Sequence, residues 1–186
     1  MKTTRKGFTL IELIVVIAII GVLAAILVPA MLGWVKKSKI QAANADAKTI
    51  MTNINAGLEE IDEEGRDIDL GNGWYGTLTD GADGETGDTT GSDGPVETWS
   101  VVLQYVKEYS DSITNSRYSA RLHEGVVIAC VARSGKYYGT YPAGLTNKNY
   151  DDELDSNSLA AAQEFAMEQY NEGREEELPV GDNQES

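Results

Sequence analysis

The sequence has 186 residues, a length that allows one long anchoring helix and a single folded domain of ordinary size. Its formal net charge of −15 is segregated, because the first 39 residues hold six of the 15 basic residues but only one of the 30 acidic ones. The rest of the chain is strongly acidic, which argues against nucleic-acid binding by charge attraction.

A long apolar segment follows the first seven residues. Between Phe8 and Val28 nearly every side chain is apolar, with Thr9 and Glu12 as the polar interruptions. A helix of this length can span the roughly 30 Å hydrocarbon core of a bilayer. Three basic residues precede the segment, and the positive-inside rule places them in the cytoplasm with the acidic region outside. We therefore expect a single-pass precursor in the cytoplasmic membrane.

Glu12 distinguishes this segment from simpler membrane elements. A secretory signal peptide has a shorter apolar region of about 7 to 15 residues and a small-residue cleavage site, which is missing here. A plain signal anchor explains everything except Glu12, because a carboxylate inside a spanning helix costs about 2.5 to 3.5 kcal/mol. A cut between Gly7 and Phe8 would create an α-amino group four residues from Glu12, on the same helix face. That cut would give Glu12 a counter-charge.

The residues "KGFTLIE", positions 6 to 12, resemble the class III signal of type IV prepilins and pseudopilins. The resemblance implies that a membrane prepilin peptidase cuts after Gly7 and methylates the nitrogen of Phe8. It also implies that Glu12 neutralises the Phe8 amine of an adjacent subunit during assembly, although a pair within one chain is sterically possible too. The implied partners are the peptidase, related pilin subunits in a helical filament and an inner-membrane assembly platform.

Gly21 and Pro29 lie inside the apolar segment, at positions where the resembling proteins have helix-weakening residues. Pro29 removes a backbone donor and clashes with the carbonyl of Ala25, and Gly21 adds backbone freedom. One interpretation is a harmless kink, since both residue types are frequent in membrane helices. The other, which the resemblance favours, is a local extension of residues 21–29 in an assembled filament.

Between residues 36 and 64 the apolar residues recur at steps of three or four, which predicts an amphipathic continuation of the same helix. Gly65 is the expected stop. The residues that set this spacing are Ile40, Ala43, Ala47, Ile50, Ile54, Leu58 and Ile61.

Residues 80–94, "DGADGETGDTTGSDG", are too rich in glycine and aspartate for regular structure. Asp80, Asp83, Glu85 and Asp88 are oxygen donors of the kind that calcium prefers, but their spacing does not fit an EF-hand loop. We favour a solvated loop, and calcium is the one cofactor left open.

The remaining patterns predict a head with α+β architecture, in which a small antiparallel sheet packs on the long helix. A helix is expected over 98–109, strands over "RYSARLH", "GVVIACVA" and "KYYGTY", and a final helix capped by Ser158 or Ser156. The predicted organisation is a leader over 1–7, a membrane and filament-core helix over 8–35, its amphipathic continuation over 36–64, a head over 65–171 and an acidic, disordered tail over 172–186.

No set of residues forms a recognisable catalytic group. Cys130, the sole cysteine, is expected to be a buried strand residue, and His123, the sole histidine, a polar residue at a strand end. Tyr137, Tyr138 and Tyr141 are expected to pack on the sheet. We therefore predict a non-enzymatic subunit of a type IV pilus or pilus-like filament. The alternatives are a pseudopilin or minor pilin of a type II secretion or DNA-uptake machine, or a membrane-anchored extracellular binding module.

Overall fold

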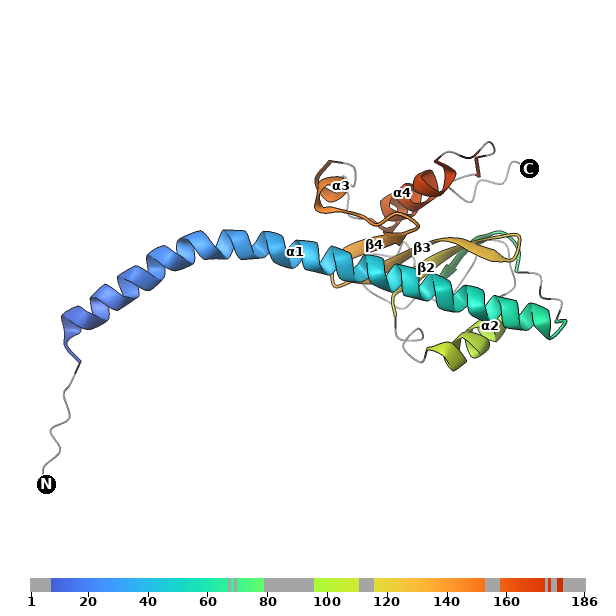
Figure 1. Ribbon diagram of the computed structural model, residues 1–186, viewed down its shortest axis with the longest axis horizontal. Coiled ribbons are helices and arrows are strands. Elements are labelled where there is room, and N and C mark those ends of the chain that lie inside the picture. The colour runs from blue at the N-terminus through green and yellow to red at the C-terminus, as the bar shows by residue number, and fades with distance from the viewer. Residues whose placement is uncertain are drawn as a thin grey trace, which may run out of the picture. The chain divides into compact units, whose positions relative to one another are not determined.

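The computed structural model describes residues 8–66, 68, 70–78, 96–110, 116–152, 158–172, 174, 177 and 178 (Figure 1). The chain divides into two compact units, Met1–Lys36 and Lys37–Ser186, and each unit is described by itself. The expected acidic loop at 80–94 and its possible calcium ligands Asp80, Asp83, Glu85 and Asp88 lie outside the described residues, as does Gly7.

Helix α1 extends over Leu10–Glu63 and contains Pro29. Its part in the second unit buries one stripe of small and branched apolar residues at the predicted spacing of three or four, as an amphipathic helix requires. The helix stops where expected, because Gly65 takes a positive φ of 69° that favours glycine. The amide of Arg66 then donates to the carbonyl of Ile61 at 3.2 Å and closes the helix end.

The second unit contains a four-stranded antiparallel sheet in the order β1-β2-β3-β4. The strands are β1 (Gly73–Gly76), β2 (Tyr118–His123), β3 (Val126–Ser134) and β4 (Tyr137–Tyr141). The three predicted strands are confirmed, whereas β1 was not predicted as a strand. It has only four residues and a glycine at each end, so it shows no alternation of apolar and polar residues. The α+β fold class is confirmed.

Helices cover both faces of the sheet (Figure 1). Cys130 and Ala132 of β3 pack in a core with α1 and with α2 (Val96–Tyr109), which confirms the predicted second helix. Ala129 and Val131, on the opposite face of the same strand, pack in a second core with α4 (Leu159–Asn171). Successive side chains of a strand point to opposite faces, so β3 is apolar from Val127 to Ala132 because both of its faces are buried there.

Two asparagines on α1 connect the helix to the sheet by paired hydrogen bonds. Asn44 Oδ1 accepts from the amides of Thr140 at 2.9 Å and Leu145 at 3.1 Å, and its Nδ2 donates to the Leu145 carbonyl at 2.8 Å. Asn55 accepts from the Val127 amide at 2.8 Å and donates to the Val127 carbonyl at 3.2 Å. Each side-chain amide therefore satisfies backbone donors and acceptors of the sheet and of the segment after β4.

The C-terminal helices are locally capped. Ser158 Oγ accepts from the Ala161 amide at 3.2 Å, which confirms Ser158 as the cap of α4. A short helix, α3 (Asn147–Asp152), was not predicted. Leu178 was expected in the disordered tail but packs on the second core. The Asn171 side chain donates to the Leu178 carbonyl at 2.8 Å and accepts from the Leu178 amide at 3.1 Å.

Cys130 is completely buried, as predicted, and burial raises the pKa of its thiol. A higher pKa means less thiolate at any given pH, and the thiolate is the reactive form. We expect the native chain to resist a maleimide at pH 7.5 while a urea-unfolded sample reacts fully, as followed by mass spectrometry. Because Cys130 is the sole cysteine, any maleimide adduct on a thiol must be on this residue. Rapid labelling of the folded chain would contradict the buried position.

Candidate assembly site

The first turn of α1 is closed by Thr9 and Glu12. The Thr9 amide and hydroxyl both donate to Glu12 Oε2, at 2.9 and 2.6 Å. In return the Glu12 amide donates to Thr9 Oγ1 at 3.4 Å. This reciprocal pattern is a capping box, which satisfies amides that have no partner inside the helix. The carboxylate also lies at the positive end of the helix dipole, which favours its ionised form.

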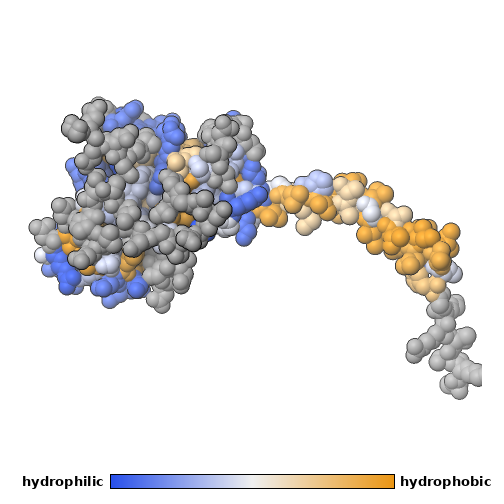
Figure 2. Space-filling view, turned by 180° about the vertical axis from the view of Figure 1, so that it is seen from behind, coloured by the Kyte–Doolittle hydropathy of each residue, from blue (hydrophilic) through white to orange (hydrophobic). Residues whose placement is uncertain are grey.

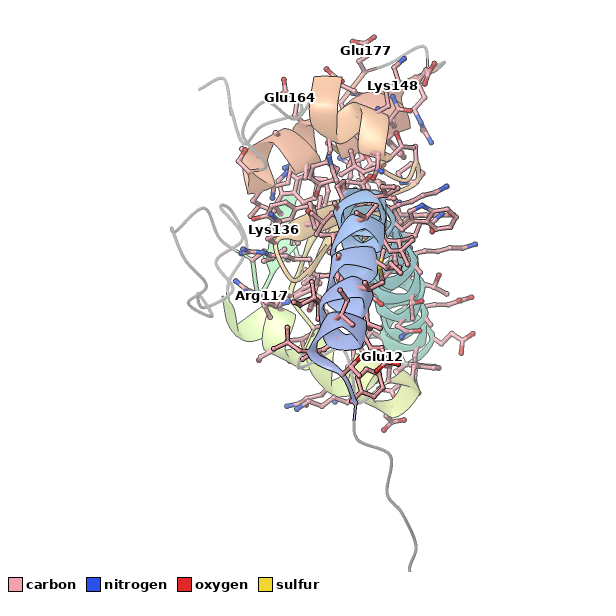
Figure 3. The ribbon with its side chains drawn as sticks, turned by 90° about the vertical axis from the view of Figure 1, so that its left-hand side faces the viewer. Glu12, Arg117, Lys136, Lys148, Glu164 and Glu177 are labelled. Carbon is pink, nitrogen blue, oxygen red and sulfur yellow. The ribbon has the colours of Figure 1, made fainter. Side chains whose placement is uncertain are left out.

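The capping geometry leaves part of the Glu12 carboxylate available. Both donors from Thr9 use Oε2, and Oε1 has no hydrogen-bond partner among the described residues. Glu12 lies at the start of α1 (Figure 3), four residues from Phe8. One carboxylate can therefore cap its own helix and accept a second, cationic partner at the same time.

The surroundings of Glu12 are apolar and uncovered. Every large apolar side chain from Phe8 to Val35 is exposed, and Figure 2 shows them in orange along α1. The helix is long and apolar enough to cross a membrane. An apolar surface of this extent needs either lipid or the helices of other copies to cover it.

Gly21 and Pro29 both lie within α1 in the single chain. A Cβ added at Gly21 would meet nothing within 4 Å, so no contact inside this chain requires glycine there. A small residue on an uncovered helix face allows another helix to approach closely. The extension of residues 21–29 was predicted for a filament, and it stays a prediction.

The other residues singled out from the sequence do not form a second site. His123 ends β2 and is half-buried. Tyr138 is buried, and Tyr137 packs edge-on against Tyr150 with ring centroids 5.6 Å apart. Among the described residues, no group of three or more histidine, cysteine, aspartate or glutamate side chains could hold a metal ion.

The N-terminal region is also where the chain resembles known proteins. Residues 2–28 match the family model of the prokaryotic N-terminal methylation motif. A type IV major fimbrial protein FimA from Dichelobacter nodosus is 39% identical over 71 residues, which cover 38% of this chain and 45% of the relative. A fimbrial protein from the same organism is 37% identical over 81 residues, which cover 44% and 51%. The chain thus spans about half the length of these curated relatives.

The N-terminal segment thus matches the methylation motif, and the chain is similar to type IV fimbrial proteins over part of its length. No solved structure matches the chain.

Sequence reasoning singled out Glu12 but missed the capping contact of Thr9. In the sequence, Thr9 stands out only as a polar interruption of the apolar segment. However, Thr-x-x-Glu before an apolar run is also the pattern of a capping box. That signal was present at residues 9 to 12 and could have been used. The long-range contacts of Asn44 and Asn55 had no such signal.

Proposed function

We propose that this chain is a structural subunit of a type IV pilus or pilus-like filament, a member of the type IV pilin family. A prepilin peptidase cuts the precursor after Gly7 and methylates the Phe8 nitrogen, and the subunit then assembles through α1. The observation that carries the proposal is an uncovered apolar helix whose first turn presents the carboxylate of Glu12 next to the cut position. The match to the N-terminal methylation motif over residues 2–28 and the names of the fimbrial relatives support the same class.

The proposal accounts for two successive environments of α1. In the precursor, lipid covers the apolar side chains, and the basic leader keeps the N-terminus in the cytoplasm. In the filament, the same side chains pack on α1 helices of other subunits, handed over by an inner-membrane assembly platform. In the precursor, the helix satisfies the backbone groups of the segment within the bilayer.

Glu12 supplies the electrostatic part of assembly. The Phe8 amine of an adjacent subunit is a cation in an apolar setting, where an uncompensated charge is costly. Glu12 Oε1 can pair with that amine while Oε2 keeps the capping contacts to Thr9. The acidic head then faces the medium at the cell surface.

Mass spectrometry of the N-terminal peptide from native cells tests the processing step. We expect a peptide that begins at Phe8 and carries one additional methyl group on its α-nitrogen. A matched control is the Gly7→Leu precursor, which should keep its leader because the residue before the cut is changed. An intact Met1 terminus on the native protein would reject the proposed function.

A further inference from the structure

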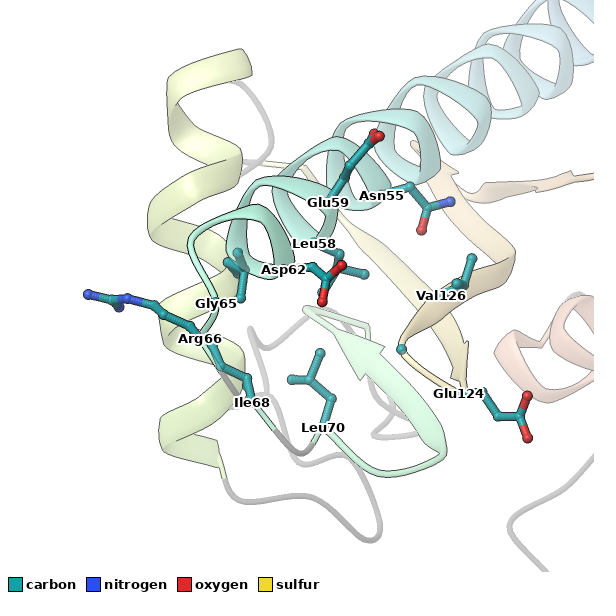
Figure 4. Close-up of a pocket in the computed structure, with 12 residues that line it drawn as sticks. Asn55, Leu58, Glu59, Asp62, Gly65, Arg66, Ile68, Leu70, Glu124 and Val126 are labelled. Carbon is teal, nitrogen blue, oxygen red and sulfur yellow. The ribbon is translucent and has the colours of Figure 1, made fainter.

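A groove lies at the C-terminal end of α1, on the head. It is lined by the last turns of α1, the segment up to Leu70 and the turn between β2 and β3, and its volume is about 790 Å³ (Figure 4). Leu58, Ile68 and Val126 form its apolar part, and Val126 is 52% exposed. We call this surface the acidic groove, because carboxylates line it.

Three carboxylates line the acidic groove, those of Glu59, Asp62 and Glu124, and Figure 4 shows Asp62 directed into it. None of the three forms an ion pair within the part of the chain that the structure describes. Arg66 also lines the groove but approaches Glu64 instead, with Nε 3.5 Å from its carboxylate.

Neighbouring charges make this end of α1 still more negative. Its last turn holds no basic residue, so the negative end of the helix dipole faces further carboxylates. Glu60 accepts a hydrogen bond from Tyr109, and Glu64 accepts one from Tyr105, which raises the pKa of both tyrosines. These contacts engage Glu60 and Glu64, while the three groove carboxylates form no ion pair among the described residues. A cationic partner would relieve like-charge repulsion there.

A second groove of about 460 Å³ lies where α1 enters the head, and it has the opposite charge. Lys37 of α1 and Lys148 of α3 line it together with neutral polar residues such as Gln41 and Thr146, and no carboxylate lines it. Both lysines are exposed, and neither forms an ion pair among the described residues. We call this surface the lysine groove, and Lys148 is labelled in Figure 3.

The two grooves lie at opposite ends of the head. Lys37 and Asp62 are separated along α1 by a rise of about 38 Å at 1.5 Å per residue. Complementary surfaces at opposite ends of one subunit make a head-to-tail contact, which propagates as an open filament when the rotation does not close a ring. A surface that paired with itself would give a closed dimer instead.

We propose that the acidic groove of one subunit receives the lysine groove of a second copy of this chain. The inference rests on the proposed function, because the N-terminal helices bring the copies together. Exposed charge pairs add little affinity individually, but they fix which surfaces meet and in which register. The head thereby adds a second charge contact to the axial stacking of the subunits, beside the pair of Glu12 with the Phe8 amine at the N-terminal helices.

Reciprocal charge reversal in the full-length chain tests the contact, with the yield of sheared filaments as the readout. Each of two double variants is expected to lower the yield at least about tenfold. One is Asp62→Lys with Glu124→Lys, and the other is Lys37→Glu with Lys148→Glu. The four substitutions together should restore most of it, since each pair then meets the opposite charge. The matched controls Glu168→Lys on α4 and Lys107→Glu on α2 should leave the yield unchanged.

The outcomes separate this inference from the proposed function. If the wild-type chain forms no filament, the proposed function is wrong. If it forms filaments and the reversals have no effect, or if the fourfold variant is not restored, the contact between grooves is wrong. A charge reversal could unfold the head, which trypsin sensitivity would reveal. In that case the double variant Asp62→Asn with Glu124→Gln is used as the test instead. These neutral changes should make filaments dissociate at lower salt, and an unchanged salt dependence would overturn the contact.

Discussion

Cells that express the Glu12→Gln chain are expected to yield at least about tenfold fewer filaments than wild-type cells, with normal amounts of precursor in the membrane. Glutamine keeps an oxygen that can accept the Thr9 amide hydrogen bond, so the capping box survives. What is lost is the negative charge that would meet the Phe8 amine of the next subunit. Immunoblots of the sheared and membrane fractions measure the two quantities.

Thr9→Val is the matched control for this substitution. It removes the hydroxyl that donates to Glu12 Oε2 at 2.6 Å but leaves the carboxylate charged. Removal of a cap costs about 1 kcal/mol at most sites, which a helix of 54 residues tolerates. We therefore expect filament yields near those of the wild type. Normal yields from Glu12→Gln would show that the charge is not needed, and a membrane-anchored module would become the better hypothesis.

The second large effect is expected from Gly139→Ala, which should lower the stability of the head by at least about 3 kcal/mol. Strand β4 passes so close to α1 that a Cβ at residue 139 would lie 2.2 Å from backbone atoms of Ala43 and Asn44. Backbone cannot yield as a flexible side chain does, so the strand and the helix must separate. That separation would also break the hydrogen bonds of Asn44 to Thr140 and Leu145.

Thermal unfolding of the full chain in detergent, followed by near-ultraviolet circular dichroism, measures this effect. The midpoint should fall by roughly 6 to 12 °C for a chain of this size. Gly57→Ala should cost less, because its Cβ would first meet the terminal methyl group of Val106 at 2.9 Å. Gly33→Ala serves as the control with open space around it. A midpoint for Gly139→Ala within 2 °C of the wild type, roughly the effect of a 0.5 to 1 kcal/mol change, would contradict the close approach.

Local patterns in the sequence predicted most elements of the fold. The spacing of apolar residues predicted α2 and the buried stripe of α1, and alternation or short apolar runs predicted β2, β3 and β4. Elements β1 and α3 were missed because four and six residues are too few to show a period. The contact between Asn44 and Leu145 joins residues 101 positions apart, and no local rule reports such a pairing.

The geometry of the candidate assembly site could be predicted from the sequence only in part. The apolar segment and Glu12 stood out because charge is unfavourable in lipid, and this reasoning needed no structure. Only the structure shows that Oε2 of Glu12 accepts both hydrogen bonds from Thr9 while Oε1 has no partner among the described residues. The two grooves on the head also needed them, because each gathers residues from separate segments: α1 with the turn between β2 and β3, and α1 with α3.

The attachment of the sheet to α1 has a mechanical consequence for a filament built from this chain. Asn44 and Asn55 both lie on the one helix that would also form the filament core, and they connect it to β3 and β4. Tension along the filament would pass from one helix to the next without crossing the strand ladders of the sheet. The helix α1 would then bear the tension, and the head would be attached to it without bearing tension itself. This attachment uses hydrogen bonds and packing rather than an intramolecular disulfide, since the chain has a single cysteine.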